Sequence, residues 1–183
     1  ADQLPYDLVL QAAGLKPNVE VMADAGAELG RTGALHVDDR QETSLSGVYA
    51  AGDCCESMHL VSGKPVWLPL GTTANKQGRV AGSNAAGSRE RFPGITGTSI
   101  VRVAGLAVAM TGLSMQQARR DGFSPIEARI ESRDKPKYFR GRLVTVQLIA
   151  DRNSRRLLGA VVVGDDSAAG RINVVAAALT ARM

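Results

Sequence analysis

A glycine–aspartate pair, Gly52-Asp53, ends a short apolar run, residues 47–51, that is typical of a buried strand. Such a pair places a carboxylate at the carboxyl end of a sheet, where α/β proteins bind ligands. Glycine lets the backbone approach a ligand closely, and the carboxylate of Asp53 can accept hydrogen bonds from sugar-like hydroxyl groups. The alternative is that Asp53 opens an Asx-turn with a purely local role. The residues alone leave both interpretations open.

A second candidate site lies in residues 69–79, which read PLGTTANKQGR. Gly71 before Thr72 and Thr73 is typical of a helix start whose first N–H groups and positive dipole end stay unoccupied. Such an end stabilises negative charge on a phosphate, an oxyanion or a reduced flavin ring. An ordinary capped helix is the alternative interpretation.

Other chemistry is excluded or disfavoured by spacing. No two glycines are separated by one residue, so a Gly-x-Gly-x-x-Gly pyrophosphate loop cannot exist in this chain, and a Walker loop is absent too. Cys54 and Cys55 are adjacent, which excludes a Cys-x-x-Cys pair and favours packed small residues. His36 and His59 are isolated and lack the neighbours of a metal site or a catalytic triad, so we expect surface or core histidines.

The elements that must position these residues change character near residue 94. In the first segment we expect strands over residues 7–12, 34–37 and 47–51, a short helix or turn within 18–29, and a helix over 72–86. In that last helix we expect a face of small residues suited to close packing, formed by Ala74, Gly78, Ala81 and Ala85.

The second segment has the pattern of an α+β module. Ser114 and Ser167 are predicted to cap two helices, and Gly122 to stop the first of them. Strands are predicted over residues 99–103, 106–110, 124–130, 143–150 and 157–163, with a hairpin connection at 151–155.

Composition sets the class of protein. The 183 residues are 44% hydrophobic and 22% charged, which is typical of a soluble globular chain, and no apolar run reaches the roughly 18 residues of a membrane span. Net charge is −3 over residues 1–94 and +7 over 95–183, but the basic residues are scattered and only 4% of residues are aromatic, so we expect no nucleic-acid partner. Two adjacent cysteines form no disulfide framework, which fits a reducing, cytoplasmic setting.

Taken in order, the motifs resemble the FAD-dependent pyridine nucleotide-disulfide oxidoreductases, in particular the group of CoA-disulfide reductase, NADH oxidase and NADH peroxidase. The resemblance is carried by Ala12-x-Gly14-x-x-Pro17-Asn18, by residues 43–54 (TSLSGVYAAGDC), by residues 69–79, and in the second segment by 112–114, 158–164 and 171–174. It implies a C-terminal part of an α/β FAD-binding domain over residues 1–94, followed over 95–183 by an α+β dimerisation domain with an antiparallel sheet and flanking helices.

The resemblance also implies roles for particular residues. Asp53 would bind the ribityl chain of FAD, with Gly52 giving close access. Leu70, Gly71 and Thr72 would lie at the helix start that faces the isoalloxazine ring, and Pro69 would line the nicotinamide side with its backbone. The implied protein is a homodimer that takes electrons from NAD(P)H and passes them to a disulfide, persulfide, peroxide or oxygen.

Family members are longer, and their two glycine-rich loops and redox-active cysteine lie upstream of the stretch matched here. We therefore expect this chain to be a fragment that is inactive by itself, has no catalytic residue of its own, and requires an N-terminal FAD- and NAD-binding portion as partner. The alternative is a self-standing module that binds no cofactor and associates with itself.

Overall fold

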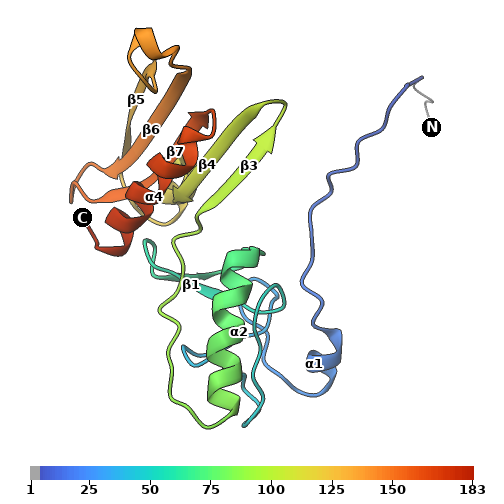
Figure 1. The fold of residues 1–183 in the computed structure, drawn as a ribbon. Coiled ribbons are helices and arrows are strands. Elements are labelled where there is room, and N and C mark those ends of the chain that lie inside the picture. The colour runs from blue at the N-terminus through green and yellow to red at the C-terminus, as the bar shows by residue number, and fades with distance from the viewer. Residues whose placement is uncertain (1–4) are drawn as a thin grey trace.

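The computed structural model describes residues 5–183 and shows two halves joined by the segment that follows α2 (Figure 1). The elements of the first half are α1 (Glu20–Asp24), β1 (Ser57–His59), β2 (Lys64–Val66) and α2 (Gly71–Ala85). Those of the second half are β3 (Ser99–Val103), β4 (Leu106–Gly112), α3 (Met115–Arg120), β5 (Pro125–Arg133), the 3₁₀ helix η1 (Lys137–Phe139), β6 (Leu143–Asp151), β7 (Leu157–Gly164) and α4 (Ser167–Thr180). Within residues 5–183, no helix has both the length and the apolar character needed to cross a bilayer.

The three strands predicted in the first half are wrong as regular strands. Residues 7–12 are extended and exposed, with Leu8 86% and Leu10 87% accessible. Residues 34–37 and 47–51 make isolated bridges only, Leu35 to Leu29 and Cys55, and Tyr49 to Glu42. A strand requires a neighbour along its whole length to pair its N–H and C=O groups. Among the described residues these segments meet such a neighbour at single positions or not at all.

The helix predicted over residues 72–86 is confirmed as α2, and its predicted small-residue face is confirmed in part, since Ala81 is buried and Ala74 is half-buried. Gly78 and Ala85 of the predicted small-residue face are exposed. The buried face consists of Thr73, Gln77, Val80, Ala81 and Asn84. Three of these five side chains are polar, and two of them, Gln77 and Asn84, form hydrogen bonds to the loops that pack on the helix. Hydrophobic periodicity does not reveal a face of this kind.

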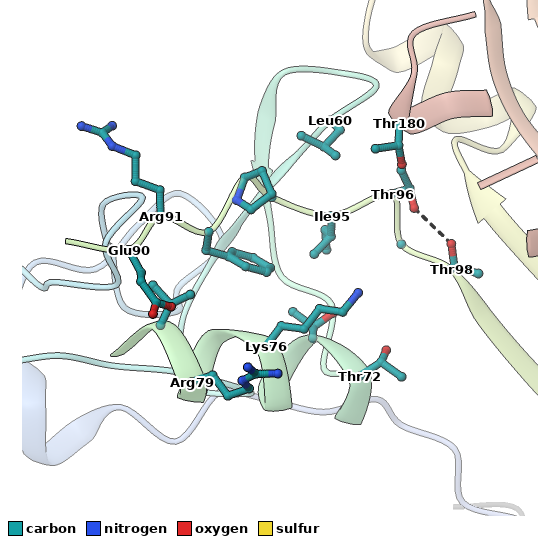
Figure 2. A pocket seen from close by; sticks show the side chains of 16 residues that line it. Leu60, Thr72, Lys76, Arg79, Glu90, Arg91, Ile95, Thr96, Thr98 and Thr180 are labelled. Atoms are coloured by element: carbon teal, nitrogen blue, oxygen red, sulfur yellow. Dashed lines mark hydrogen bonds between the residues drawn. The ribbon is translucent and has the colours of Figure 1, made fainter. Parts of the chain in front are cut away.

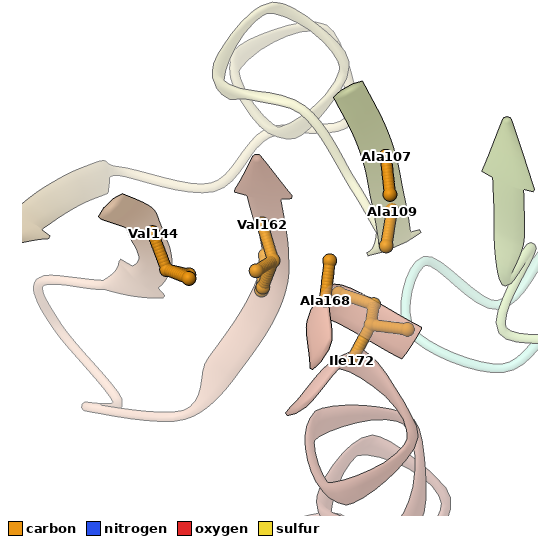
Figure 3. Packing of buried hydrophobic residues seen from close by; sticks show 7 residues of the cluster. Ala107, Ala109, Val144, Val162, Ala168 and Ile172 are labelled. Carbon is orange, nitrogen blue, oxygen red and sulfur yellow. The ribbon is translucent and has the colours of Figure 1, made fainter. Parts of the chain in front are cut away.

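The second half is a five-stranded antiparallel sheet with the order β3-β4-β7-β6-β5, so the five predicted strands are confirmed. Helix α4 packs across β4 and β7 (Figures 1 and 3). The core beneath it combines small and branched side chains, which lets the helix lie close to the sheet. Its buried members are Ala107, Ala109, Val144, Ala160, Val162, Ala168 and Ile172.

One of the two predicted helix caps is confirmed and the other is wrong. Ser114 caps α3 in a capping box with Gln117, and Gly122 follows the helix with a φ of +95°, which favours glycine. Ser167, by contrast, is the first residue of α4 and does not cap it. Its N–H donates to Oδ1 of Asp165 at 2.9 Å, so an aspartate two residues earlier accepts the hydrogen bond.

The two halves contact each other around residues 95–97. Ile95 forms a β-bridge to His59, the last residue of β1, and the Gly112 N–H donates to the Thr96 carbonyl at 2.7 Å. Val61 of the first half lies in one apolar cluster with Leu113 and Leu158 of the second. The segment after α2 is therefore anchored to both halves.

Candidate functional site

The Gly52-Asp53 pair forms a tight turn. Gly52 has a φ of +83°, the left-handed region that L side chains rarely adopt, and the Cys55 N–H donates to the Gly52 carbonyl at 3.2 Å. The side chain of Asp53 is exposed, and within residues 5–183 its carboxylate has no hydrogen bond or ion pair. The turn is thus closed by the backbone, and the carboxylate oxygens are available to a ligand.

The turn packs directly on α2. A Cβ built on Gly52 would lie 3.2 Å from Cβ of Ala74, so the glycine backbone touches the first turn of the helix. The Gly52 N–H donates to Oε1 of Gln77 at 2.9 Å, and Nε1 of Trp67, just before the helix, donates to the Asp53 carbonyl at 2.7 Å. The structure therefore brings the two candidate sites of the sequence together.

The N-terminus of α2 is open. Leu70 is the N-cap, with an extended backbone and no side-chain cap, and its carbonyl accepts from the N–H groups of Thr73 and Ala74. Among the described residues nothing accepts the N–H groups of Gly71 and Thr72, and a Cβ on Gly71 would meet no atom within 4 Å. An unoccupied helix N-terminus carries partial positive charge, worth about 0.3–1 kcal/mol to a neighbouring negative charge.

A cavity of about 420 Å³ lies between α2 and residues 90–98 (Figure 2). Of the residues predicted for the site, Thr72 lines this cavity, together with Lys76 and Arg79 from the next helical turns. No role is predicted for these two cations from the sequence. Their spacing from Thr72 could have identified them, because residues three and four apart lie on the same face of a helix.

The two cysteines are packed small residues, as predicted. Cys55 is buried with Ala27, Leu35 and Ala50, and Cys54 packs against the same cluster. The neighbouring Cys55 thiol lowers the pKa of Cys54 to about 6, against the effect of burial, and correspondingly raises the pKa of Cys55. His59 is a core histidine, one of the two environments expected for it, and its burial lowers its pKa.

Two models of one family match successive parts of the chain. The model described as pyridine nucleotide-disulphide oxidoreductase matches residues 1–78, and the model of that family's dimerisation domain matches residues 98–183. The order of the two models confirms the predicted fold class, a partial oxidoreductase domain followed by a dimerisation domain.

Curated relatives and solved structures give the same result. The CoA-dependent NAD(P)H sulfur oxidoreductase of Pyrococcus furiosus is 42% identical over 96% of this chain. A NAD-dependent persulfide reductase from A. fulgidus superposes with a TM-score of 0.90 at 39% identity, over 94% of this chain and 32% of that one. A FAD-dependent pyridine nucleotide-disulphide oxidoreductase from Desulfovibrio vulgaris gives a TM-score of 0.85 at 37% identity, over 98% of this chain and 43% of that one.

The chain spans about 40% of the length of the Pyrococcus relative. Its motifs, its two successive family matches and its structural neighbours agree with one another. The chain belongs to the pyridine nucleotide-disulphide oxidoreductase family.

Proposed function

We propose that residues 1–183 are part of an NAD(P)H-dependent flavoprotein oxidoreductase and supply its contacts to the ribityl chain and isoalloxazine ring of FAD as well as its dimer interface. The supporting observation is the joint position of an unpaired carboxylate and an open helix N-terminus. The turn that carries Asp53 packs against the helix that begins at Gly71, because a Cβ added at Gly52 would lie only 3.2 Å from Cβ of Ala74.

The residues present fit the two parts of a flavin that they would hold. The exposed carboxylate of Asp53 is an acceptor for the hydroxyl groups of the ribityl chain, and Gly52 leaves no side chain in the way. The free N–H groups of Gly71 and Thr72 complement the electron-rich reduced ring. Leu70 and Pro69, both half-buried, would line the ring and the nicotinamide side by their backbone.

FAD, when bound, would supply the two-electron chemistry between the nicotinamide and the acceptor. The chain itself would orient the ring and stabilise its negative charge. We assign it no catalytic residue. The pyrophosphate loop and the reactive cysteine would belong to the rest of the enzyme, because the relatives are more than twice as long as this chain.

We place the boundary between the FAD-binding portion and the dimerisation domain at residues 94 and 95, and we propose that the enzyme is a homodimer. The match of residues 98–183 to a dimerisation domain supports this state. Apolar side chains on β3 and β4 that are 45–61% exposed also support it, since they would be covered by a second copy. They are Ile100, Val101, Val103, Leu106 and Met110.

For the acceptor we propose a persulfide or disulfide of low molecular weight, of the coenzyme A type. The names of the Pyrococcus furiosus and A. fulgidus relatives support this choice over oxygen or peroxide. The same relatives disfavour the alternative of a cofactor-free module.

The test is a chimera in which this chain replaces the matching region of the Pyrococcus furiosus relative. The purified chimera should be yellow, and Asp53→Ala should weaken FAD binding roughly tenfold or more, as expected for a lost charge-assisted hydrogen bond. Asp53→Asn, which keeps an oxygen acceptor, should lose less. A colourless chimera, or equal FAD affinity in the wild-type and Asp53→Ala forms, would refute the proposal.

A further inference from the structure

The side chain of Gln77 lies in the second turn of α2 and is fully buried, with 0% of its surface exposed. A buried primary amide is costly unless each of its polar atoms has a partner. Gln77 meets this requirement, and all its partners lie in residues 52–57. Its Oε1 accepts from the Gly52 N–H at 2.9 Å, and its Nε2 donates to Ser57 Oγ at 2.9 Å and to the Glu56 carbonyl at 3.5 Å.

These partners determine which way the amide points. The Gly52 N–H can only donate and the Glu56 carbonyl can only accept, so Oε1 must face Gly52 and Nε2 must face Glu56. The amide thus spans the turn from its first residue to the residues just beyond its end. No other side chain of α2 forms a hydrogen bond to residues 52–57 within the part of the chain that the structure describes.

We propose that Gln77 is a positioning residue for the flavin. It sets the distance between the Gly52-Asp53 turn and the N-terminus of α2, and this distance determines the affinity with which the turn and the helix N-terminus together bind FAD. This inference rests on the proposed function of that site. Without the amide, the Gly52 N–H loses its acceptor and the turn keeps the Trp67–Asp53 hydrogen bond and van der Waals contact with Ala74 as its ties to the helix region.

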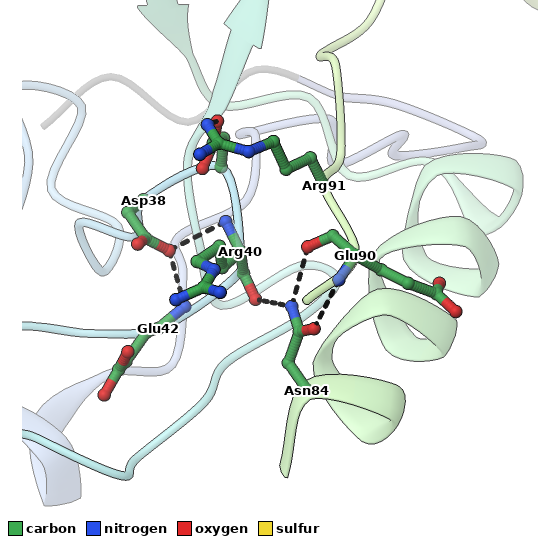
Figure 4. A network of polar contacts seen from close by, with 7 residues as sticks. Asp38, Arg40, Glu42, Asn84, Glu90 and Arg91 are labelled. Atoms are coloured by element: carbon green, nitrogen blue, oxygen red, sulfur yellow. Dashed lines mark hydrogen bonds and ion pairs between the residues drawn. The ribbon is translucent and has the colours of Figure 1, made fainter. Parts of the chain in front are cut away.

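The same helix contains a matched control, Asn84, seven residues further along. It is buried to a similar degree, at 6% exposed, and its amide also forms three hydrogen bonds to loops. Nδ2 donates to the carbonyls of Arg40 and Glu90, and Oδ1 accepts from the Glu90 N–H at 2.7 Å (Figure 4). None of these partners belongs to residues 52–57, so a variant of Asn84 loses a comparable buried network without releasing the turn.

The experiment compares Gln77→Met, Gln77→Glu and Asn84→Leu in the chimera, with FAD affinity and melting temperature measured for each. Gln77→Met removes the acceptor and should weaken FAD binding roughly tenfold or more, because a buried N–H is left unpaired. Gln77→Glu keeps an oxygen toward the Gly52 N–H but loses the donor toward the Glu56 carbonyl, so it should lower the melting temperature and lose less FAD affinity than Gln77→Met. Asn84→Leu should lower the melting temperature and leave FAD affinity unchanged.

A second readout needs no flavin. In the chain of residues 1–183, amide hydrogen exchange at Gly52 should be faster in Gln77→Met than in wild type, and unchanged in Asn84→Leu. The positioning role is overturned if Gln77→Met binds FAD as tightly as wild type, or if Asn84→Leu loses as much FAD affinity as Gln77→Met. In either case a yellow wild-type chimera still supports the proposed function. A colourless wild-type chimera overturns the proposed function and this inference with it.

Discussion

Replacing Gly52 by alanine tests whether the turn really packs on α2. The added methyl group has two consequences. It forces an L side chain into a backbone with a φ of +83°, which costs about 1–2 kcal/mol. It also lies 3.2 Å from Cβ and 3.8 Å from Cα of Ala74, where the helix backbone limits how far the neighbour can move, and overpacking of this kind costs typically 1–3 kcal/mol.

Gly47→Ala separates the two terms. Gly47 has a similar φ of +76°, but a Cβ there meets no atom within 4 Å. Both variants also stiffen the unfolded chain by the same amount, so that effect cancels in the comparison. We expect Gly52→Ala to lose about 1–3 kcal/mol more than Gly47→Ala, which corresponds to several degrees in melting temperature for a chain of this size.

The assay is urea unfolding of the chain followed by tryptophan fluorescence. Trp67 is the only tryptophan, and its indole N–H donates to the Asp53 carbonyl, so the signal arises beside the turn itself. Equal losses of unfolding free energy in the two variants would show that Gly52 does not pack against the helix, and would refute the joint site on which the flavin proposal depends.

Two further predictions concern titratable groups. Alkylation of Cys54 by iodoacetamide should be half-maximal near pH 6, because the neighbouring Cys55 thiol lowers the pKa of Cys54 to about 6. Mass spectrometry of the wild type and of Cys54→Ser will locate the label, and a midpoint near pH 9 would contradict this effect of Cys55. The carboxylate of Asp151 accepts from the hydroxyl and N–H of Ser154 and from the Ser124 N–H, which lowers its pKa from 3.8. Its contribution to stability is therefore complete above about pH 3.8 and is lost as the pH falls below it. In urea titrations between about pH 2 and 6, the free energy of unfolding of Asp151→Asn should therefore fall less steeply with decreasing pH than that of wild type. The same pH dependence in both proteins would contradict this role of the Asp151 carboxylate.

The second half of the fold could be predicted well because its signals are local. The strands alternate or are continuously apolar, Ser114 and Gly122 bound α3, and each strand pairs with another strand of the same segment. The strands of the first half were predicted from equally apolar residues, yet 7–12 forms no ladder. Strand formation depends on a partner, and residues 5–183 provide none for that segment.

The site shows the same division. The types of its residues, an aspartate after a glycine and a helix start without a side-chain cap, could be identified from the sequence and from its family resemblance. Gln77 could not be identified in the same way, because a glutamine in a helix is usually solvent-exposed. Only the packing of α2 against the turn buries this side chain and lets it accept a hydrogen bond from the Gly52 N–H.

The amino-acid sequence by itself determined the chemical groups available and the order in which they occur, since composition, glycine spacing and helix-start residues are properties of the chain. The tertiary structure alone decided that Asp53 and the start of α2 lie together, 18 residues apart in sequence, and which face of α2 is buried. The physical reason is that both depend on long-range hydrogen bonds and close contacts, such as those of Gln77 and Gly52, which form only when distant segments of the chain pack against each other.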